Sequence, residues 1–326
     1  MNDLAARLYV PRIAANAAAA TACRPGRSGP AILPGPRALL PKISALSGIS
    51  LQRRPAEWPA TLGRLGSLEI RLATSAAEIR HAQRLRYKIF YGEMSAAAGL
   101  ISLITQRDLD EFDPICDHLL VFDKTSAEGP ANVAVATCRL LRQDVADRRG
   151  GFYTAGEYSL AELIDRHRAL RFLELGRSCV LRPYRSKRTV ELLWHGIWSY
   201  AVRHGIDVLV GCASFEGTDP DKLALPLSYL HHYHYASAPE AWRLGAQPRR
   251  YIEMNRLPKR AVDIKAALAD LPPLIKGYLR LGAYVGHGAV IDRKFGTTDV
   301  AIILPVSAIN TRYIQHFGPT AERHAA

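Results

Sequence analysis

The sequence of 326 residues contains no long hydrophobic run. No apolar stretch approaches the roughly 18 to 20 residues that a membrane-spanning helix needs. The longest candidate, residues 300–309, is too short and contains Pro305. Apolar residues make up 48% of the chain and charged residues 22%, a balance that is typical of water-soluble globular proteins. We therefore expect a cytoplasmic protein that does not cross a bilayer.

Cysteine is also scarce, and its spacing argues against a disulfide framework, a cysteine nucleophile or a zinc site. The five cysteines are widely spaced, odd in number and form no Cys-x-x-Cys pair. Four of them lie in apolar, strand-like segments, so we expect small core residues in a reducing compartment. The histidine-rich segment 231–234 has no acidic or Cys/His partner at ligand spacing. We interpret it as a polar helix end and expect no bound metal.

Acidic residues are few relative to basic ones, and the excess positive charge is concentrated at the start of the chain. The formal net charge is +13, of which residues 1–66 contribute +7 from nine Lys/Arg and two acids. Such a balance fits nucleic acid, anionic lipid or an acidic protein as a partner. Charge alone does not choose among these three partners.

Residues 1–66 lack any sustained helical or alternating pattern and are rich in Ala, Pro, Gly, Ser and Arg. We interpret them as a disordered basic extension. No continuous apolar core follows the early arginines, so the segment is not typical of a secretory signal. A start codon assigned too far upstream, or a tether to an anionic membrane surface, would produce the same composition.

Regular patterns begin at Ser67. Ser75 and Glu78 have capping-box spacing, and apolar residues at helical spacing follow them to about Tyr91. An acidic loop comes next, and Glu128-Gly129-Pro130 marks a later turn. The other predicted elements are strands at 68–73, 118–123, 132–141, 171–180 and 206–212, and helices at 159–168 and 190–204, the latter closed by Gly205. Beyond residue 250 we expect a helix, a glycine-rich loop and a final strand. This order predicts an α/β domain with a sheet flanked by helices.

Six ordered blocks resemble one known family. They are LRYKIFYGEM (85–94), DEFDPICDHLLV (110–121), CRLL (138–141), LELGRSCV (173–180), GCASFEGTDP (211–220) and LPPLIKGYLRLGA (271–283). These blocks are similar to the ornithine N-alpha-acyltransferases of ornithine-lipid synthesis, whose members are often called hemolysin-like. The resemblance implies a GNAT-like acyltransferase domain with a mixed sheet over about residues 67–318, including a C-terminal extension. Residues 1–66 then form the N-terminal extension and residues 319–326 a tail.

The same blocks are distantly similar to the acyl-homoserine-lactone synthases, and this similarity implies candidate site residues. The matching positions are Arg86 and Phe90 on the first helix, Asp110 and Asp113 in the following loop, Arg139 on a strand, and Glu174 and Arg177 in a Glu-x-x-Arg motif.

The resemblance implies transfer of a 3-hydroxyacyl group from acyl carrier protein to the α-amine of L-ornithine, giving lyso-ornithine lipid. The phosphopantetheine thioester of the carrier protein is then a co-substrate, with no permanently bound cofactor and no nucleic-acid partner. The product is amphiphilic and would leave into the inner leaflet. We therefore expect peripheral association with the inner face of the cytoplasmic membrane.

Acylation of an amine by a thioester requires removal of a proton, close positioning of the amine and donors for the developing oxyanion. Direct attack within a ternary complex meets these requirements without the Ser-His-Asp or Cys-His arrangement of a covalent mechanism. Glu174 is the candidate general base, because its apolar neighbours would raise its pKa. Arg177 is the candidate for bidentate binding of the amino acid's carboxylate. A structural ion pair between the two is the alternative.

Glu174 and Arg177 lie three residues apart, so on a regular strand their side chains would point to opposite faces. They can share a site only if a β-bulge intervenes, and Gly176 would permit one. We therefore predict a bulge at Leu175–Gly176, whose released backbone N–H groups could serve as oxyanion donors.

The acidic loop has two interpretations that the sequence leaves open. Asp110, Asp113 and Asp117 could bind a cationic substrate side chain, which would fit ornithine. They could equally form a solvated loop that caps a helix or pairs with Arg86 or Arg139.

The turn at 181–189 lacks the glycines that bind the pyrophosphate of coenzyme A in many GNAT enzymes. Four cations stand in their place: Arg182, Arg185, Lys187 and Arg188. Side-chain cations suit the single phosphate and the acidic surface of acyl carrier protein. A solvated basic turn is the alternative interpretation.

Three other functions compete with ornithine acylation. A homoserine-lactone synthase would use S-adenosylmethionine, and the additional C-terminal block 271–283 argues against it. A membrane-active, hemolysin-like protein without catalysis would need a strongly amphipathic or spanning segment, which we do not find in the sequence. The missing glycines at 181–189 argue against a coenzyme A-dependent acetyltransferase.

Overall fold

The computed structural model describes residues 60–94, 96–125, 134–310 and 313. The predicted tail at 319–326, the turn at Glu128–Pro130 and most of the predicted N-terminal extension lie outside these residues. Residues 63–65 belong to the segment predicted as extension, and they form a strand that pairs with the next one. Regular structure therefore begins before Ser67, the residue at which the apolar alternation becomes visible in the sequence.

Ten strands form one mixed sheet. Its order is β1-β2-β3-β4-β5-β6-β10-β9-β7, with β8 paired to β10. Neighbouring strands are antiparallel except β5 and β6, which are parallel. The strands are β1 (Gly63–Leu65), β2 (Leu68–Leu72), β3 (Asp117–Asp123), β4 (Ala134–Arg142), β5 (Phe172–Val180), β6 (Val208–Glu216), β7 (Tyr251–Ile252), β8 (Tyr284–Val285), β9 (Ala289–Asp292) and β10 (Thr297–Pro305).

Eight α-helices and several shorter helical turns connect the strands in the described part of the chain. The helices are α1 (Ala76–Phe90), α2 (Leu100–Thr105), α3 (Gln143–Ala146), α4 (Leu160–Arg166), α5 (Lys187–Arg203), α6 (Ala224–Leu230), α7 (Ile264–Asp270) and α8 (Pro273–Arg280). The short turns are η4 (Tyr153–Gly156), η5 (Arg182–Tyr184), η6 (His231–Tyr235), η7 (Glu240–Trp242), η8 (Lys259–Ala261) and η9 (Val306–Ala308). None of these helices is long and apolar enough to cross a membrane.

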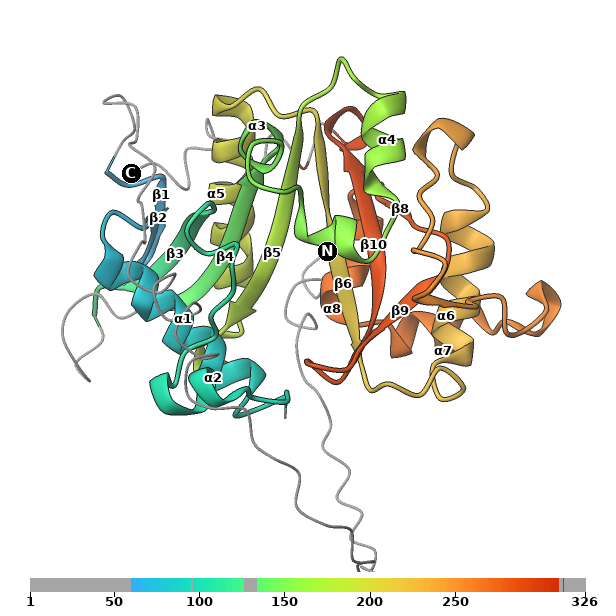
Figure 1. Cartoon of the computed structure of the whole chain (residues 1–326), viewed down its shortest axis with the longest axis horizontal. Coiled ribbons are helices and arrows are strands. Elements are labelled where there is room, and N and C mark those ends of the chain that lie inside the picture. The colour runs from blue at the N-terminus through green and yellow to red at the C-terminus, as the bar shows by residue number, and fades with distance from the viewer. Residues whose placement is uncertain (1–59, 95, 126–133, 311–312, 314–326) are drawn as a thin grey trace, which may run out of the picture.

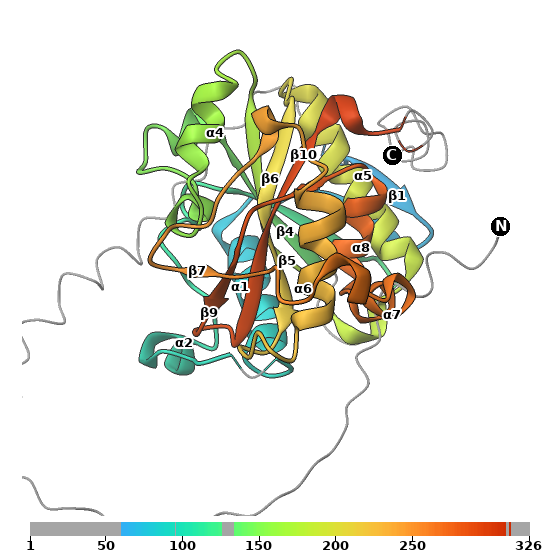
Figure 2. The same ribbon diagram turned by 90° about the vertical axis from the view of Figure 1, so that its right-hand side faces the viewer.

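Helices cover both faces of the sheet (Figures 1 and 2). On one face, called here the α1 face, α1 packs on β4 and β5, and α4 lies over the other half of the sheet. On the opposite α5 face, α5 packs on β1, β2 and β3, and α8 packs on β6. The apolar core of the α5 face is continuous across the sheet, whereas that of the α1 face is divided into two clusters. The polar site described below belongs to the α1 face.

The predicted elements are largely confirmed, with changes at their ends. The side chain of Ser75 caps α1 by accepting a hydrogen bond from the N–H of Glu78. The carboxylate of Glu78 instead accepts from the backbone and hydroxyl of Thr74, one residue before its expected partner. Gly205, at φ 57°, ends α5 as predicted. Helices α2, α3, α6 and α7 and strands β1, β7, β8 and β9 were not predicted, because each is only two to seven residues long.

Strands β5 and β6 pair only over a short length. The parallel register joins Phe172–Glu174 to Val208–Val210 and ends there, although both strands continue for six more residues. Figure 1 shows the two strands diverging beyond this point. Gly211 lies at the start of the divergence, where a Cβ atom would stand 2.5 Å from the carbonyl oxygen of Leu175. The close approach explains why the position has no side chain.

A bulge interrupts β5, but its predicted position was wrong. Thr137 of β4 pairs with Cys179, and Arg139 pairs with Gly176, so β5 carries one additional residue between these pairs. The bulge therefore lies at Arg177–Ser178, not at Leu175–Gly176. Arg177 itself adopts the left-handed conformation with φ 51°, which is rare for a residue with a long side chain. A glycine would adopt this conformation without strain. At Arg177 the polar contacts of the guanidinium offset the strain of the backbone.

Candidate functional site

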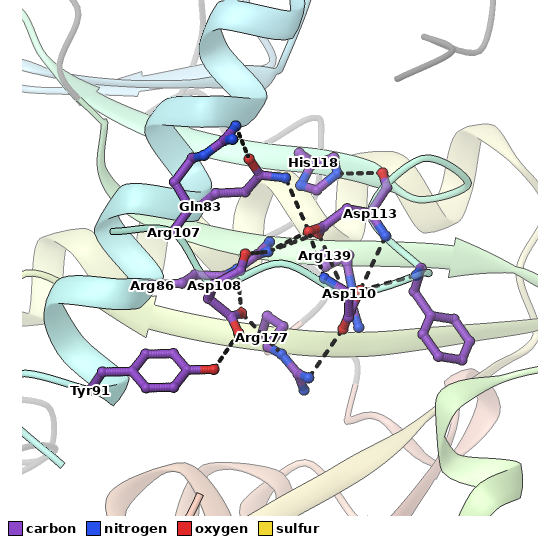
Figure 3. Close-up of polar contacts among 11 residues, drawn as sticks. Gln83, Arg86, Tyr91, Arg107, Asp108, Asp110, Asp113, His118, Arg139 and Arg177 are labelled. Carbon is purple, nitrogen blue, oxygen red and sulfur yellow. Dashed lines mark hydrogen bonds and ion pairs between the residues drawn. The ribbon is translucent and has the colours of Figure 1, made fainter. Parts of the chain in front are cut away.

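Three arginines and three aspartates form a buried network between α1 and the sheet (Figure 3). The arginines come from three elements, α1, β4 and β5, and all the aspartates come from the acidic loop before β3. Arg86 and Asp108 have no exposed side-chain surface, and Asp113 has 3%. The network therefore joins a helix, a loop and two strands through charges that are removed from water.

Arg86 is the centre of the network. Its Nε donates to Oδ2 of Asp108 at 2.9 Å, and its Nη2 donates to Oδ1 of Asp113 at 2.8 Å and to the carbonyl oxygen of Asp108 at 2.7 Å. Around it, Tyr91 donates to Asp108 and Gln83 donates to Asp113. Charge-assisted hydrogen bonds of this kind are about twice as strong as neutral ones.

Arg139 and Arg177 complete the pairing. Nη1 of Arg139 donates to Asp110 at 2.5 Å and to Asp113 at 3.3 Å. Arg177 donates from Nε to Asp108 at 3.3 Å and from Nη2 to Asp110 at 3.1 Å. Three guanidinium groups thus balance three carboxylates. Although burial opposes ionisation, Arg86 and Arg139 hold the pKa of Asp113 well below its ordinary value.

This pairing bears on the two interpretations of the acidic loop. Asp113 pairs with Arg86 and both aspartates pair with Arg139, as the second interpretation expected, but the aspartates are buried and not solvated. Asp110 also pairs with Arg177, and both oxygens of each carboxylate accept hydrogen bonds. Asp117 lies apart from them, on β3, and accepts from the hydroxyl of Tyr200 at 2.6 Å. A direct role of the loop in binding a cationic substrate remains a prediction, and it would require an arginine to be displaced.

Aromatic rings surround the guanidinium of Arg177. It lies 4.8 Å from the ring centre of Tyr153 and 4.6 Å from that of Phe295, within the range of cation–π attraction. Phe90 packs edge-on against Phe295 at 5.5 Å. The bulge turns Arg177 toward the α1 face, where Glu174 also lies. Tyr153 connects the two, because its ring contacts Arg177 and its backbone N–H donates to Glu174.

Glu174 is buried beneath the short turn η4. Its two carboxylate oxygens accept the backbone N–H groups of Tyr153 at 3.0 Å and Thr154 at 2.6 Å. Burial raises the pKa of Glu174, and the hydrogen bonds from Thr154 and Tyr153 oppose the rise. The hydroxyl of Thr154 is a further partner, so three of about four lone-pair sites of the carboxylate are used. Glu174 therefore anchors η4 and retains the capacity to accept one more proton donor.

A second acidic cluster lies across the divergence of β5 and β6 and could hold a cation. Glu157, Asp292 and Asp299 each place a carboxylate oxygen within 4.8 Å of the others. Burial and the nearby charge of Asp299 raise the pKa of Glu157 to about 7. Tyr153 reaches this cluster as well, since its hydroxyl donates to Asp292 at 3.4 Å. Its ring and hydroxyl therefore span from Arg177 to the acidic cluster.

The four cations of the basic turn lie apart from both clusters, at the end of β5 and the start of α5. Arg182, Lys187 and Arg188 are exposed. Arg185 differs, because its guanidinium is held by Glu93 at 2.5 Å and by the carbonyl oxygen of Val180 at 3.0 Å. Ser186 caps α5 by accepting the N–H of Thr189. Three of the four cations are therefore available to an external anionic partner.

Comparison with known proteins identifies the family. The chain is 53% identical over 277 residues to the L-ornithine N(alpha)-acyltransferase of Rhizobium meliloti, covering 84% of this chain and 93% of that protein. It is also 53% identical to the L-ornithine N(alpha)-acyltransferase of Brucella abortus, covering 80% of this chain and 92% of the relative. The chain belongs to the L-ornithine N(alpha)-acyltransferase family. The family expected from the sequence blocks is confirmed.

A model of the acetyltransferase (GNAT) domain matches residues 85–195 of this acyltransferase. The solved structure of the AHL synthase LasI is similar at a TM-score of 0.39 and 10% identity, covering 77% of this chain and 94% of that one. The matched domain runs from α1 to the middle of α5 and includes the buried network, the bulge and the basic turn. The expected GNAT-like mixed sheet flanked by helices is confirmed.

Several residues of the candidate site were not predicted. Asp108 lies in the acidic loop that was singled out, but its position gave no reason to prefer it to its neighbours. Asp299 could have been noticed as the single charged residue in the apolar strand TTDVAIILP. Glu157, Tyr153 and Phe295 carry no sequence signal, because only the folded chain brings η4 and the β9–β10 connection to Arg177.

Replacing Arg86 with methionine tests how strongly the acyltransferase depends on the network. The variant leaves Asp108 and Asp113 buried without their main counter-charge, so we expect the free energy of unfolding to fall by about 3–5 kcal/mol. Urea denaturation measures this change. Arg84→Met removes an exposed arginine from the same helix and should stay within about 0.5 kcal/mol of the parent. Equal losses in the two variants would show that the network is not a major source of stability.

Proposed function

We propose that the protein transfers a 3-hydroxyacyl group from acyl carrier protein to the α-amine of L-ornithine, giving lyso-ornithine lipid. The observation that carries the proposal is the 53% identity, over 84% of this chain and 93% of the relative, to a protein named L-ornithine N(alpha)-acyltransferase. The geometry supports a direct transfer. Arg177, Glu174 and the second acidic cluster lie on the α1 face of the sheet, and the cluster lies across the divergence of β5 and β6 from Arg177.

In the proposed reaction, the neutral α-amine nitrogen attacks the thioester carbon. A C–N bond forms, the carbonyl oxygen becomes an oxyanion, and collapse of the intermediate breaks the C–S bond. The first proton leaves the ammonium before attack, and the second passes from nitrogen to the departing thiolate. The bulge at Arg177–Ser178 takes its backbone out of regular register with β4, and its N–H groups are our candidates for oxyanion donors.

Glu174 is the proposed acceptor of the first proton, directly or through a water molecule. Its raised pKa brings the carboxylate closer to the pKa of the amine, about 8 to 9, which favours proton transfer at neutral pH. Arg177 is the proposed partner of the amino acid's carboxylate. Its Nε and Nη2 already bind Asp108 and Asp110, so substrate binding would use Nη1 or exchange one of these contacts. Arg86, Arg139, Asp110 and Asp113 would then position Arg177, and Phe90 would support it through Phe295.

Glu174→Gln tests the role of the proposed base. We expect kcat to fall by about 10²–10⁴-fold, with a much smaller change in the KM for ornithine. The loss should shrink as pH rises above the pKa of the amine, because more of the substrate is then already deprotonated. Steady-state kinetics across pH, with thermal denaturation to confirm folding, measure both effects. If the loss of kcat in Glu174→Gln is the same at every pH, the role of Glu174 is to anchor η4 and not to accept the proton.

The donor is proposed to be acyl carrier protein. The turn before α5 contains no glycine, and Arg182 of the turn and Lys187 and Arg188 at the start of α5 are exposed to solvent. Exposed cations of this kind complement an acidic protein surface and a single phosphate. Arg185 would support the turn from inside through its contact with Glu93.

One assay tests the proposed function and its rivals. The purified full chain is incubated with 3-hydroxyacyl carrier protein or the matching acyl-coenzyme A, together with a panel of amino acids. Mass spectrometry should detect N-alpha-acyl-ornithine, with a higher kcat/KM for the carrier-protein donor. A lactone formed only with S-adenosylmethionine would favour a homoserine-lactone synthase. Leakage of vesicles without acylation would favour a lytic protein.

The inner-membrane surface is a further proposed partner, and α2 supports it. Four apolar side chains of this helix are exposed: Leu100, Ile101, Leu103 and Ile104. A backbone hydrogen bond from Ala97 to the carbonyl oxygen of Lys294 ties the segment before α2 to the turn that carries Phe295. Helix α2 could insert its apolar side chains into the membrane–water interface beside the candidate site. An amphiphilic product would then leave the site directly into the membrane.

The double variant Leu100→Asp/Ile104→Asp tests the membrane contact. Burying one such side chain contributes about 1.5–3 kcal/mol, so we expect partitioning onto vesicles containing phosphatidylglycerol to fall at least about tenfold. Sedimentation with vesicles measures it. Leu268→Asp, which changes an exposed apolar residue on α7, should leave partitioning close to the parent. Equal sedimentation of the double variant and the parent would remove α2 from the proposal.

A further inference from the structure

The acidic cluster of Glu157, Asp292 and Asp299 differs from the arginine–aspartate network in one respect: its charge is not balanced. Among the described residues, the ion pair that reaches the cluster is that between Arg250 and Oε1 of Glu157, at 3.2 Å. Half of the Arg250 side chain is exposed. The three carboxylates themselves are between 2% and 9% exposed. Burial of excess negative charge is costly unless a cation binds there.

The carboxylate oxygens of Glu157 and Asp292 accept hydrogen bonds, whereas Asp299 is less well satisfied. Glu157 accepts from Arg250 and from the thiol of Cys212, and Asp292 accepts from the hydroxyl of Tyr153 and the N–H groups of residues 294 and 295. The hydroxyls of Ser214 and Thr297 act on the carboxyl group of Asp299, but its Oδ1 is buried and has no hydrogen bond of normal geometry in the part of the chain that the structure describes. A buried carboxylate oxygen left without a donor is costly, so it marks the place where a ligand's donor belongs.

The cluster also has a defined position relative to the proposed reaction. Asp299 lies on β10 opposite Ser214 of β6, on the far side of the strand divergence from Arg177. The guanidinium charge of Arg177 nevertheless acts on the carboxyl group of Asp299. Tyr153 contacts Arg177 with its ring and Asp292 with its hydroxyl. A small amino acid bound near Arg177 could therefore direct its side chain into the cluster.

An organic ammonium suits this cluster better than a divalent metal. Calcium takes six to eight oxygen ligands and magnesium near-ideal octahedral geometry, whereas most oxygens here already accept protein donors. A primary ammonium carries one positive charge and three N–H donors, so it can donate to Oδ1 of Asp299 while the other two carboxylates stabilise its charge. Glu157, with its pKa raised to about 7 and its partner Arg250, contributes less than a full negative charge at neutral pH. Burial also raises the pKa of Asp299, so the negative charge left on the cluster is smaller than the two positive charges of a divalent metal and suits a monovalent cation better.

We propose that Glu157, Asp292 and Asp299 bind the δ-ammonium of ornithine and so direct acylation to the α-amine. This inference rests on the proposed function. Ornithine carries two amines of similar nucleophilicity, and an enzyme that acylates one of them must suppress the other. Neighbouring carboxylates stabilise the charged form of an amine. The δ-nitrogen held among them stays protonated and cannot attack, while the α-amine remains free to lose its proton at the thioester.

Asp299→Asn tests the proposal with two acceptors, ornithine and norvaline, which has the same carbon chain without the δ-amine. A hydrogen bond to a charged group is worth about 1.5–3 kcal/mol, so we expect the ratio of kcat/KM for ornithine to that for norvaline to fall by about 10- to 150-fold. Tandem mass spectrometry should also show a larger fraction of N-delta-acyl product. Glu162→Gln, an exposed carboxylate on α4, should change neither the ratio nor the regiochemistry.

Glu157→Gln provides the same measurement if the first variant fails to fold, since it removes a charge from the same cluster. An unchanged acceptor ratio and unchanged regiochemistry in folded variants would overturn the proposal. So would loss of ornithine acylation on treatment with a chelator and its recovery with magnesium or calcium, because the cluster would then bind a metal. A parent protein that acylates neither ornithine nor norvaline would instead overturn the proposed function, and this inference with it.

Discussion

The pairing of three buried arginines with three buried aspartates is the interaction on which the site depends. Burying six charges is costly, and the cost is offset only when every charge has a close counter-charge and a hydrogen-bond partner. Arg86 meets this requirement for Asp108 and Asp113 at 2.8–2.9 Å. The loop before β3 is thereby fixed between α1 and the sheet, and its Phe112, Ile115 and Cys116 add apolar contacts with the core.

The same network determines the direction of Arg177. A regular β5 would turn this side chain to the α5 face, into an apolar core. The bulge and the left-handed backbone at Arg177 turn it to the α1 face instead. Asp108 and Asp110 supply the charges that hold it there, and Tyr153 and Phe295 enclose it. Local strain is thus offset by contacts from residues distant in the sequence, as is common where geometry serves function.

The two acidic groups of the α1 face have opposite physical characters. The aspartates of the loop are neutralised by arginines and have little capacity to bind a further cation. Glu157, Asp292 and Asp299 retain excess negative charge and an oxygen without a hydrogen bond of normal geometry among the described residues. The cationic side chain of the proposed substrate therefore fits the second group better than the first. Composition could not reveal this difference, because each group consists of three acidic residues.

The sequence by itself determined the fold class, the family and the order of the main elements. Apolar periodicity gives α1, α5 and most strands, because each buries one face against the sheet. The six sequence blocks gave the residues of the arginine–aspartate network except Asp108. Only the tertiary structure decided how these residues pair, where the bulge lies and which acids remain unpaired. Those properties depend on contacts between β9, β10, η4 and the acidic loop, and such contacts form only when distant segments pack together.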